Sequence, residues 1–376
     1  MTAPGKNVEI GLVLQGGGAL GAYECGAVSA LLELMELAQE CGCGVHLKAV
    51  TGVSIGAINA ACIVGARDWS DARRRINALW DDLTLRAPSF WPHEVQRDLS
   101  LFGLPGFYQP RVDYLALGHW TSFYDTRPLL ATLPRYVDFD LLNRSETMLV
   151  VSAVDVESGE LTRFSNRRHQ RAAATTITPR HVLASGSLPP QFPWTEIEGR
   201  RYWDGGIVNN APLGDAIAAF THGQDIDRIL VVLDLYPLRG RLPGTIREVE
   251  DRVHELSFGN RLRQDHQVAD QFNALLRTIE ELAPLVPAGD MSPALQQRVA
   301  RAREYKLVTV LDIDMQTRTE RPTEDKDGIR DFSAPTVAAR RAHGHANAHA
   351  SLFRLFVDRG FVTAEPDRRA AAPAGS

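Results

Sequence analysis

The sequence GVSIG at residues 52–56 has the pattern G-x-S-x-G and places Ser54 at its centre. It ends an apolar run, residues 47–54, that predicts a strand, and it precedes a run that favours a helix. A serine on a tight turn between a strand and a helix presents its hydroxyl clear of the backbone, and the start of the helix favours developing negative charge. The pattern predicts that Ser54 is a nucleophile for acyl transfer, with Gly52 and Gly56 leaving room around the turn.

A glycine-rich stretch, GGGALG at residues 16–21, lies between another predicted strand and another predicted helix. Dinucleotide-binding proteins use G-x-G-x-x-G to hold a pyrophosphate, but they also need an acidic residue about 20 positions later, at the end of the next strand. The next strand, residues 47–53, has no aspartate or glutamate, so a dinucleotide-binding protein is the less favoured alternative. Bare N–H groups beside a nucleophile can instead stabilise an oxyanion. The sequence thus predicts an oxyanion hole, supported by Gly21, at three residues: Gly16, Gly17 and Gly18.

The nucleophile needs a base, and the sequence offers two kinds. Asp204 precedes Gly205 and Gly206 in RRYWDGGIVNNAPL, and two glycines after an aspartate indicate a tight loop that holds a carboxylate. A histidine is the alternative, because imidazole is the commonest catalytic base. Among the histidines that follow Asp204, three are considered as candidates, and none of them lies in a distinctive loop: His222, His254 and His266. The residues alone leave both kinds of base open.

The elements that must position these residues alternate along the chain. The opening reads strand, glycine turn, helix, strand, tight turn, helix, which predicts a parallel sheet with right-handed crossovers. The first two strands are expected to be neighbours, so that their carboxyl ends bring the glycine run to Ser54. Further strands are predicted at 148–154, 228–235 and 306–314. We expect one α/β domain: a catalytic core (7–240), a helical insertion (241–304), a strand and helix that return to the core (305–361) and a disordered tail (362–376).

Residues 90–124 contain nine aromatic side chains separated by prolines and glycines. One interpretation is an irregular loop that aromatic anchors hold on the domain. The other is a cap over an apolar substrate site that also contacts a lipid surface, for which tryptophan and tyrosine are suited.

The composition narrows the classes of function. The chain has 376 residues, of which 44% are hydrophobic and 23% are charged, and its net charge is −5 (41 basic and 46 acidic residues). No long basic block is present, which argues against a nucleic-acid partner. The apolar runs are shorter than the about 20 residues that span a bilayer, and the first ten residues lack a signal-peptide pattern. We expect a cytoplasmic protein, in peripheral contact with a membrane if its substrate is a lipid.

Four landmarks occur in the order typical of one family. They are the glycine run at 16–21, G-x-S-x-G at Ser54, ASGSLPPQFP at 184–193, and Asp204-Gly205-Gly206 followed by NNAP. On these residues the chain resembles the patatin-like phospholipases, over roughly residues 8–235. FYDTRPL at 123–129 is also similar to the family, and DFSAPTVAARRAHGHANA at 331–348 resembles C-terminal extensions of some bacterial members. Leu20 stands where some members have arginine or lysine.

The resemblance implies a three-layer α/β sandwich, with a mostly parallel central sheet flanked by helices. It also implies a dyad of Ser54 and Asp204 without a histidine, and an oxyanion hole at the glycine run. The implied activity is hydrolysis of acyl esters of lipids through an acyl-enzyme, with no cofactor and no metal. A soluble esterase, a thioesterase or an acyltransferase could use the same site.

Overall fold

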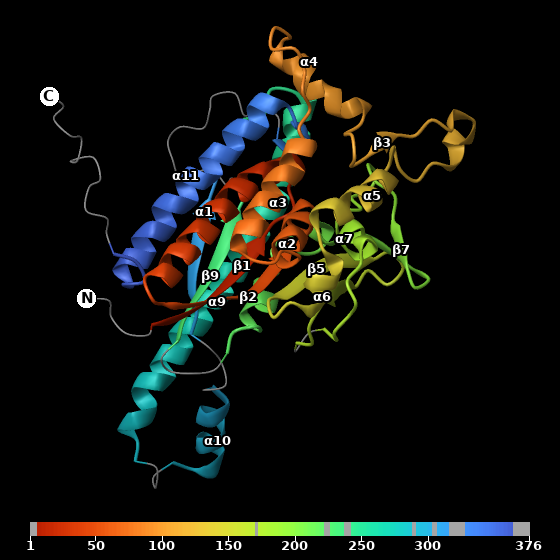
Figure 1. The fold of residues 1–376 in the computed structure, drawn as a ribbon. Coiled ribbons are helices and arrows are strands. Elements are labelled where there is room, and N and C mark those ends of the chain that lie inside the picture. The colour runs from red at the N-terminus through yellow and green to blue at the C-terminus, as the bar shows by residue number, and fades with distance from the viewer. Residues whose placement is uncertain are drawn as a thin grey trace, which may run out of the picture.

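The structure is a computed structural model that describes residues 6–169, 172–221, 226–236, 242–287, 291–302, 307–315 and 328–363. Figure 1 shows helices on both faces of one central sheet. Of the expected disordered tail (362–376), residues 364–376 lie outside the described residues, and so does His222.

The opening unit has the predicted order of elements. Strand β1 (Asn7–Leu14) leads through a short 3₁₀ turn, η1 (Gly18–Leu20), into helix α1 (Gly21–Glu40), and strand β2 (Gly44–Gly52) leads into α2 (Ile55–Val64). The two strands are parallel neighbours, with Leu14 opposite Gly52. The predicted pairing of these strands is therefore confirmed, and both end at the same edge of the sheet.

The central sheet has eight strands, in the order β10-β9-β1-β2-β5-β8-β7, with β6 paired to β5 outside this path. Strands β10, β9, β1, β2 and β5 are parallel, and β6, β7 and β8 run antiparallel to their neighbours. The mostly parallel sheet is as predicted, whereas the sequence patterns do not predict its antiparallel strands. The remaining bounds are β5 (Met148–Asp155), β6 (Leu161–Ser165), β7 (Thr195–Ile197), β8 (Arg200–Asp204), β9 (Ile226–Asp234) and β10 (Thr309–Asp314).

The helices form a layer on each face of this sheet (Figure 1). Successive side chains along a strand point to opposite faces of the sheet. In β1, Leu12 and Leu14 enter the larger hydrophobic core, on the face covered by α1, α2, α3 and α11. Val13 enters the smaller core, on the face covered by α8 and α9. The chain thus has the expected three layers. The further helices are α3 (Trp69–Asp82), α5 (Arg127–Tyr136), α6 (Phe139–Arg144), α7 (Pro179–Ser185), α8 (Leu213–Ile217), α9 (Ile246–Leu282), α10 (Pro293–Ala302) and α11 (Ala334–Asp358).

Helix α1 is buried along most of its length because α11 packs against it at very short range (Figure 1). A Cβ atom at Gly26 would lie 1.9 Å from the carbonyl oxygen of Arg341, and one at Gly344 would lie 2.0 Å from that of Tyr23. Only glycine at both positions allows the two backbones to come this close. The C-terminal helix is therefore part of the outer layer that covers the sheet.

The aromatic segment, residues 90–124, forms short elements that stand out from the body of the chain (Figure 1). They are α4 (His93–Asp98), η2 (Leu99–Phe102), β3 (Gln109–Pro110), η3 (Tyr114–His119) and β4 (Tyr124–Asp125). Strands β3 and β4 pair with each other in a separate two-stranded sheet. The boundaries of the four parts expected from the sequence remain predictions.

Candidate active site

Ser54 lies on a strained turn between β2 and α2. Its φ of 55° and ψ of −124° are unusual for a residue other than glycine, and such strain is common at functional sites. The flanking glycines make the turn possible: a Cβ atom at Gly52 would lie 2.3 Å from the carbonyl oxygen of Gly56, and one at Gly56 would lie 2.6 Å from that of Leu14. The predicted tight turn between strand and helix is therefore present, with Ser54 at its centre; the role of Ser54 as nucleophile stays a prediction.

Asp204 is the last residue of β8, and its side chain is 2% exposed. Its carboxyl oxygen Oδ1 accepts a hydrogen bond of 2.8 Å from the backbone N–H of Gly206, and the Ser54 side chain is close enough to lower the pKa of the carboxyl group. Burial raises the pKa of Asp204 to about 7, and the Ser54 side chain and the Gly206 N–H oppose this rise. The structure thus brings together two residues 150 positions apart, with a carboxyl group that titrates near neutral pH.

The two glycines after Asp204 lie where the surrounding atoms leave no room for a larger residue. A Cβ atom at Gly205 would lie 2.4 Å from the carbonyl oxygen of Ser152, and one at Gly206 would lie 3.1 Å from Asp204 Oδ1. Larger residues at either position would displace the carboxyl group or strand β5, which explains the sequence Asp-Gly-Gly.

The glycine run lies directly beside Ser54. A Cβ atom at Gly16 would lie 2.9 Å from that of Ser54, and one at Gly21 would lie 2.7 Å from Cγ1 of Ile55. The predicted proximity of the two loops is therefore present.

Gly16 differs from the expectation, because its N–H is already used. It donates a 2.9 Å hydrogen bond to Oδ1 of Asn210, whose Nδ2 donates to the Gly16 carbonyl at 3.0 Å. The Tyr236 hydroxyl donates to the same carbonyl at 2.7 Å. No described residue accepts a hydrogen bond from the N–H of Gly17 or Gly18. The candidate oxyanion donors are accordingly Gly17 and Gly18, and Gly16 is the anchored residue that positions them.

A single loop holds both the candidate nucleophile and the candidate base. The Ser54 N–H donates to the carbonyl oxygen and to Oγ of Ser185, both at 3.1 Å, and the Asp204 N–H donates to the carbonyl oxygen of Ser187 at 3.0 Å. Both serines are fully buried and belong to the landmark ASGSLPPQFP. The sequence marks this loop only through the resemblance and gives no role to its serines. Asn210 is likewise part of the NNAP landmark without a predicted role.

The histidine alternative receives no support from the described residues. The ring of His254 packs against Phe258, with ring centroids 5.9 Å apart, and no described contact joins it to Ser54 or Asp204. The side chain of His266, like the whole of His222, lies outside the described residues.

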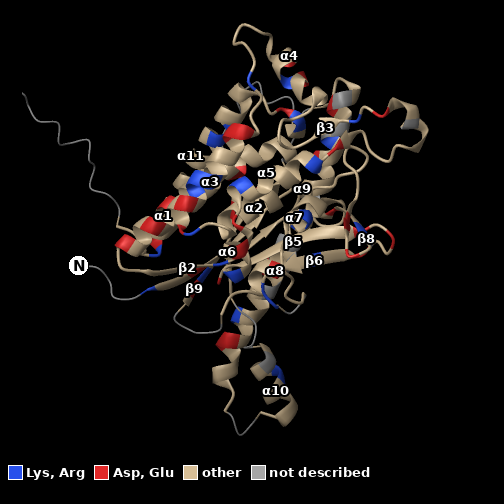
Figure 2. Cartoon of the chain, turned by 45° about the vertical axis from the view of Figure 1, so that its right-hand side comes forward, with Lys and Arg blue, Asp and Glu red and all other residues tan. Residues whose placement is uncertain are grey.

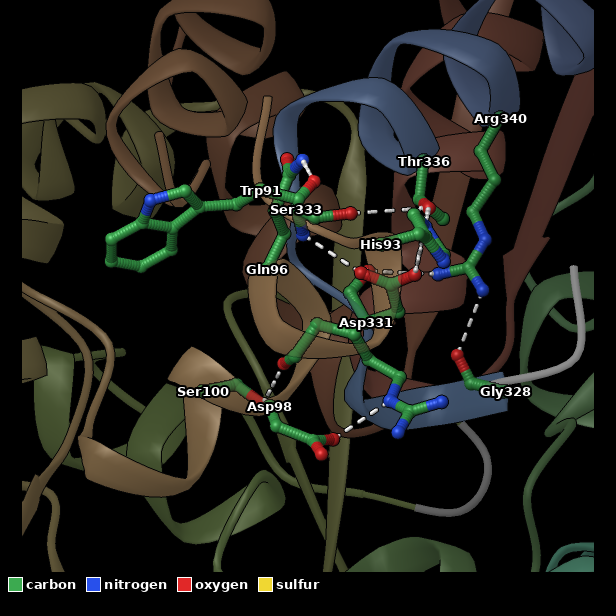
Figure 3. Close-up of polar contacts among 11 residues, drawn as sticks. Trp91, His93, Gln96, Asp98, Ser100, Gly328, Asp331, Ser333, Thr336 and Arg340 are labelled. Atoms are coloured by element: carbon green, nitrogen blue, oxygen red, sulfur yellow. Dashed lines mark hydrogen bonds and ion pairs between the residues drawn. The ribbon is translucent and has the colours of Figure 1, made fainter. Parts of the chain in front are cut away.

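Residues 328–336 connect the glycine run to the aromatic segment. The carbonyl oxygen of Ile329 would lie 2.4 Å from a Cβ atom at Gly18, whose φ is +54°. Asp331, two residues later, receives a 2.7 Å hydrogen bond from the Thr336 hydroxyl, and its Oδ2 lies 3.3 Å from Nε2 of His93 in α4 (Figure 3). This part of the C-terminal extension therefore joins α4 to the wall of the candidate site.

No group of three or more histidine, cysteine, aspartate or glutamate side chains in the described part of the chain is arranged to hold a metal ion. No described helix is both long enough and apolar enough to cross a membrane.

The chain is similar to several solved structures at low identity. It shares 14% identity with VipD from Legionella pneumophila, covering 95% of this chain and 68% of that one at a TM-score of 0.39. It shares 14% with the type III effector ExoU of Pseudomonas aeruginosa (94% and 54%, TM-score 0.37) and 12% with human GIVD cytosolic phospholipase A2 (95% and 59%, TM-score 0.39). The chain thus spans less than two thirds of the length of the last two structures.

Sequence comparison gives a family-level result. No curated protein sequence matches the chain. The family model described as patatin-like phospholipase matches residues 12–217, which is more than half of the 376 residues and includes the glycine run, the elbow and Asp204. The chain therefore belongs to the patatin-like phospholipase family.

Proposed function

We propose that this protein hydrolyses acyl esters of lipids, with Ser54 as nucleophile and Asp204 as its base. The observation that carries the proposal is the buried Asp204 carboxyl, which interacts with the side chain of Ser54 on a strained turn and whose pKa burial raises to about 7. A base is most effective when its pKa lies near the working pH, and an ordinary aspartate, with a pKa of about 3.9, would be too weak.

In the first half of the cycle, ionised Asp204 takes the hydroxyl proton of Ser54 as its Oγ attacks the ester carbonyl carbon. The backbone N–H groups of Gly17 and Gly18 donate hydrogen bonds to the oxyanion that forms. The carbon–oxygen bond to the alcohol then breaks, and the departing oxygen takes the proton from Asp204. The products of this half are the free alcohol and an acyl-enzyme on Ser54.

In the second half, water takes the place of the alcohol. Asp204 accepts a proton from the water as it attacks the acyl-enzyme carbonyl, and the same N–H groups stabilise the second oxyanion. Collapse returns the proton to Ser54 and releases the fatty acid. An alcohol acceptor in place of water would make the protein an acyltransferase, and a small soluble ester or a thioester would pass through the same steps.

A dinucleotide is disfavoured by the same geometry. A pyrophosphate in the glycine loop would need several free backbone N–H groups, and Asn210 already uses that of Gly16. The carbonyl oxygen of Ile329, which is a hydrogen-bond acceptor, packs against Gly18.

Covalent labelling tests the proposal. The protein is treated with a fluorophosphonate, the modified residue is mapped by mass spectrometry, and hydrolysis is measured on esters from short to long acyl chains and on phospholipids. We expect the label on Ser54, loss of labelling in Ser54→Ala, and loss of hydrolysis in Ser54→Ala and Asp204→Asn with unchanged folding. An Asp204→Asn enzyme that keeps more than about a tenth of the activity would show that another group is the base.

A further inference from the structure

The aromatic segment carries two sets of large apolar side chains with opposite surroundings. Phe107 and Tyr108 are buried and pack against Phe192, with ring centroids 6.0 and 5.2 Å away. This set holds the segment on the body of the chain. The other set faces solvent, and each member is more than half exposed: Phe90, Phe102, Tyr114, Leu115, Leu117 and Phe123. Exposed apolar side chains gathered in one segment are unusual in a soluble protein and indicate a contact surface.

The segment is joined to the candidate active site through backbone hydrogen bonds. The N–H of Phe123 donates to the carbonyl oxygen of Pro190 at 3.1 Å, and that of Tyr124 donates to Gln191 at 2.9 Å. Pro190 and Gln191 belong to the loop whose Ser185 and Ser187 hold Ser54 and Asp204. The segment is therefore attached directly to the part of the chain that holds Ser54 and Asp204.

Two parts of the segment project beyond the rest of the chain. Figures 1 and 2 both show the turn at α4 and the loop beyond β3 standing out from the body, at the end where α11 begins. Phe90 lies just before α4, and Leu115 and Leu117 lie in η3, within that loop. A flat surface is well suited to contact both projections together.

The segment has no excess of positive charge, because it contains three acidic side chains: Glu94, Asp98 and Asp113. Residues 90–124 contain two basic side chains other than histidine, Arg97 and Arg111. Arg97 Nε lies 2.7 Å from Oδ1 of Asp98, and Arg111 Nε lies 3.0 Å from Oδ1 of Asp113. Figure 2 shows both signs of charge near α4 and few charges on the loop beyond β3. Attraction to anionic lipids depends on unbalanced lysine and arginine near the membrane, and this surface has no excess of them.

We propose that residues 90–123 form a membrane-docking surface that inserts apolar side chains into the headgroup region of an uncharged, zwitterionic bilayer. Aromatic and leucine side chains on a neutral surface favour this zone, because their apolar atoms leave water while their backbone stays solvated. Docking here would bring the segment attached to the Ser54 site to the lipid that supplies its ester. The inference rests on the proposed lipid-hydrolysing function and assigns the partner of that site.

The test is binding of the full-length Ser54→Ala protein, which leaves lipids intact, to phosphatidylcholine vesicles in a flotation assay. Two variant pairs remove exposed side chains from the two projections: Phe90→Ser with Phe102→Ser, and Leu115→Ser with Leu117→Ser. The matched control is Leu282→Ser with Leu285→Ser, which removes two exposed leucines from α9 and the turn after it. Binding is measured at low and high salt, and with phosphatidylserine added. The same pairs with Ser54 intact are assayed on a water-soluble short-chain ester.

We expect the protein to float with phosphatidylcholine alone, with little effect of salt or phosphatidylserine. Each variant pair should weaken binding by about tenfold or more, whereas the control pair should bind as the parent does. Hydrolysis of the soluble ester should stay within about twofold in every pair. That assay separates the two proposals, because a protein that docks but cleaves no ester contradicts only the proposed chemistry.

Several outcomes would overturn the docking proposal. The first is that the protein does not bind phosphatidylcholine vesicles. The second is that binding needs anionic lipid and disappears in high salt. The third is that the control pair loses binding while the two variant pairs keep it. Light scattering tests one further alternative. If the parent is a dimer, and the variant pairs are monomers that still bind vesicles as the parent does, then a second copy of the chain covers this surface instead.

Discussion

Asn210 holds Gly16 by two hydrogen bonds, one to each polar group of its backbone. The side-chain amide thus binds Gly16 as a neighbouring strand would, at the point where β1 has ended and the loop begins. Tyr236 adds a third hydrogen bond to the Gly16 carbonyl. Both side chains are buried, so buried contacts fix the position of this loop.

Replacing Asn210 with alanine should lower kcat more than it raises KM. The Gly17 and Gly18 N–H groups would lose their alignment, and loss of an oxyanion donor costs about a hundredfold or more in kcat. The unpaired backbone groups of Gly16 should also lower the free energy of unfolding by about 1–3 kcal/mol. Steady-state kinetics on a soluble ester and thermal melting measure the two effects.

Asn209→Ala is the matched control for this variant, because the Asn209 side chain accepts a hydrogen bond from the backbone N–H of Ala211 and makes no described contact with Gly16. It should keep most of the activity. An Asn210→Ala enzyme with parental kcat would show that the loop keeps its shape without this clamp.

The rate should rise with pH through the pKa of the base. Asp204 must be ionised to accept the Ser54 proton, and its pKa is about 7 because it is buried. We therefore expect kcat/KM for a neutral soluble ester to increase about tenfold per pH unit below about pH 7 and to level off above it. The profile is measured with the free enzyme, after checking that the fold is intact across the range. A rate that is already level at about pH 5 would contradict a raised pKa for the base.

Alanine at Gly17 and at Gly18 should have different effects. A Cβ atom at Gly17 would first meet Cδ1 of Leu235, at 2.8 Å, which is the end of a flexible side chain. Gly17→Ala should therefore fold, with a small drop in melting temperature, and lose activity through displacement of the donor.

Gly18→Ala should instead be strongly destabilised. Its φ of +54° is strained for alanine, and the added Cβ atom would lie 2.4 Å from the carbonyl oxygen of Ile329. Melting temperature and kcat are measured for both variants. An equal loss of stability in the two would show that the carbonyl oxygen of Ile329 does not constrain the loop.

Glu24→Gln should make the protein more stable at neutral and alkaline pH. Glu24 is fully buried in α1, and burial raises the pKa of its carboxyl well above the usual value, against hydrogen bonds from Asn59 and Gln15. Its protonated form stabilises the fold at low pH, and that contribution is lost as the pH rises from the ordinary pKa toward the raised one, by about 1.4 kcal/mol per pH unit. Glutamine keeps the shape without the titration.

The measurement for this prediction is the free energy of unfolding of the parent and of Glu24→Gln at several pH values. Glu40→Gln serves as the control, since Glu40 is exposed at the end of the same helix. A difference between parent and Glu24→Gln that does not grow with pH would mean that Glu24 is not protonated in the folded protein.

Much of the local architecture could be predicted because it depends on short stretches of sequence. The elbow at Ser54 and the glycine run at 16–21 each combine a strand, a turn and a helix within about 20 residues, and turn geometry restricts which residues fit. The pairing of β1 with β2 follows from the rule that successive strands of this kind are usually neighbours.

The parts that could not be predicted depend on contacts between distant segments. Strand β8, which carries Asp204, is five residues long, contains two arginines and has no clear hydrophobic alternation. The choice of Asp204 over a histidine came from the family resemblance and not from its own pattern. The clamp of Asn210 on Gly16 joins residues 194 positions apart, and it corrects the expectation that all three glycines present free N–H groups.

The stretch that matches the family model, residues 12–217, leaves out contacts that surround the candidate site. Tyr236, Ile329 and the glycine of α11 that packs on α1 all lie after it. A protein cut at residue 217 would lack a hydrogen bond to the loop, the wall beside Gly18 and the cover of its first helix. In this chain, residues after 217 are a structural component of the candidate site. A domain boundary drawn from the family match alone would separate them from it.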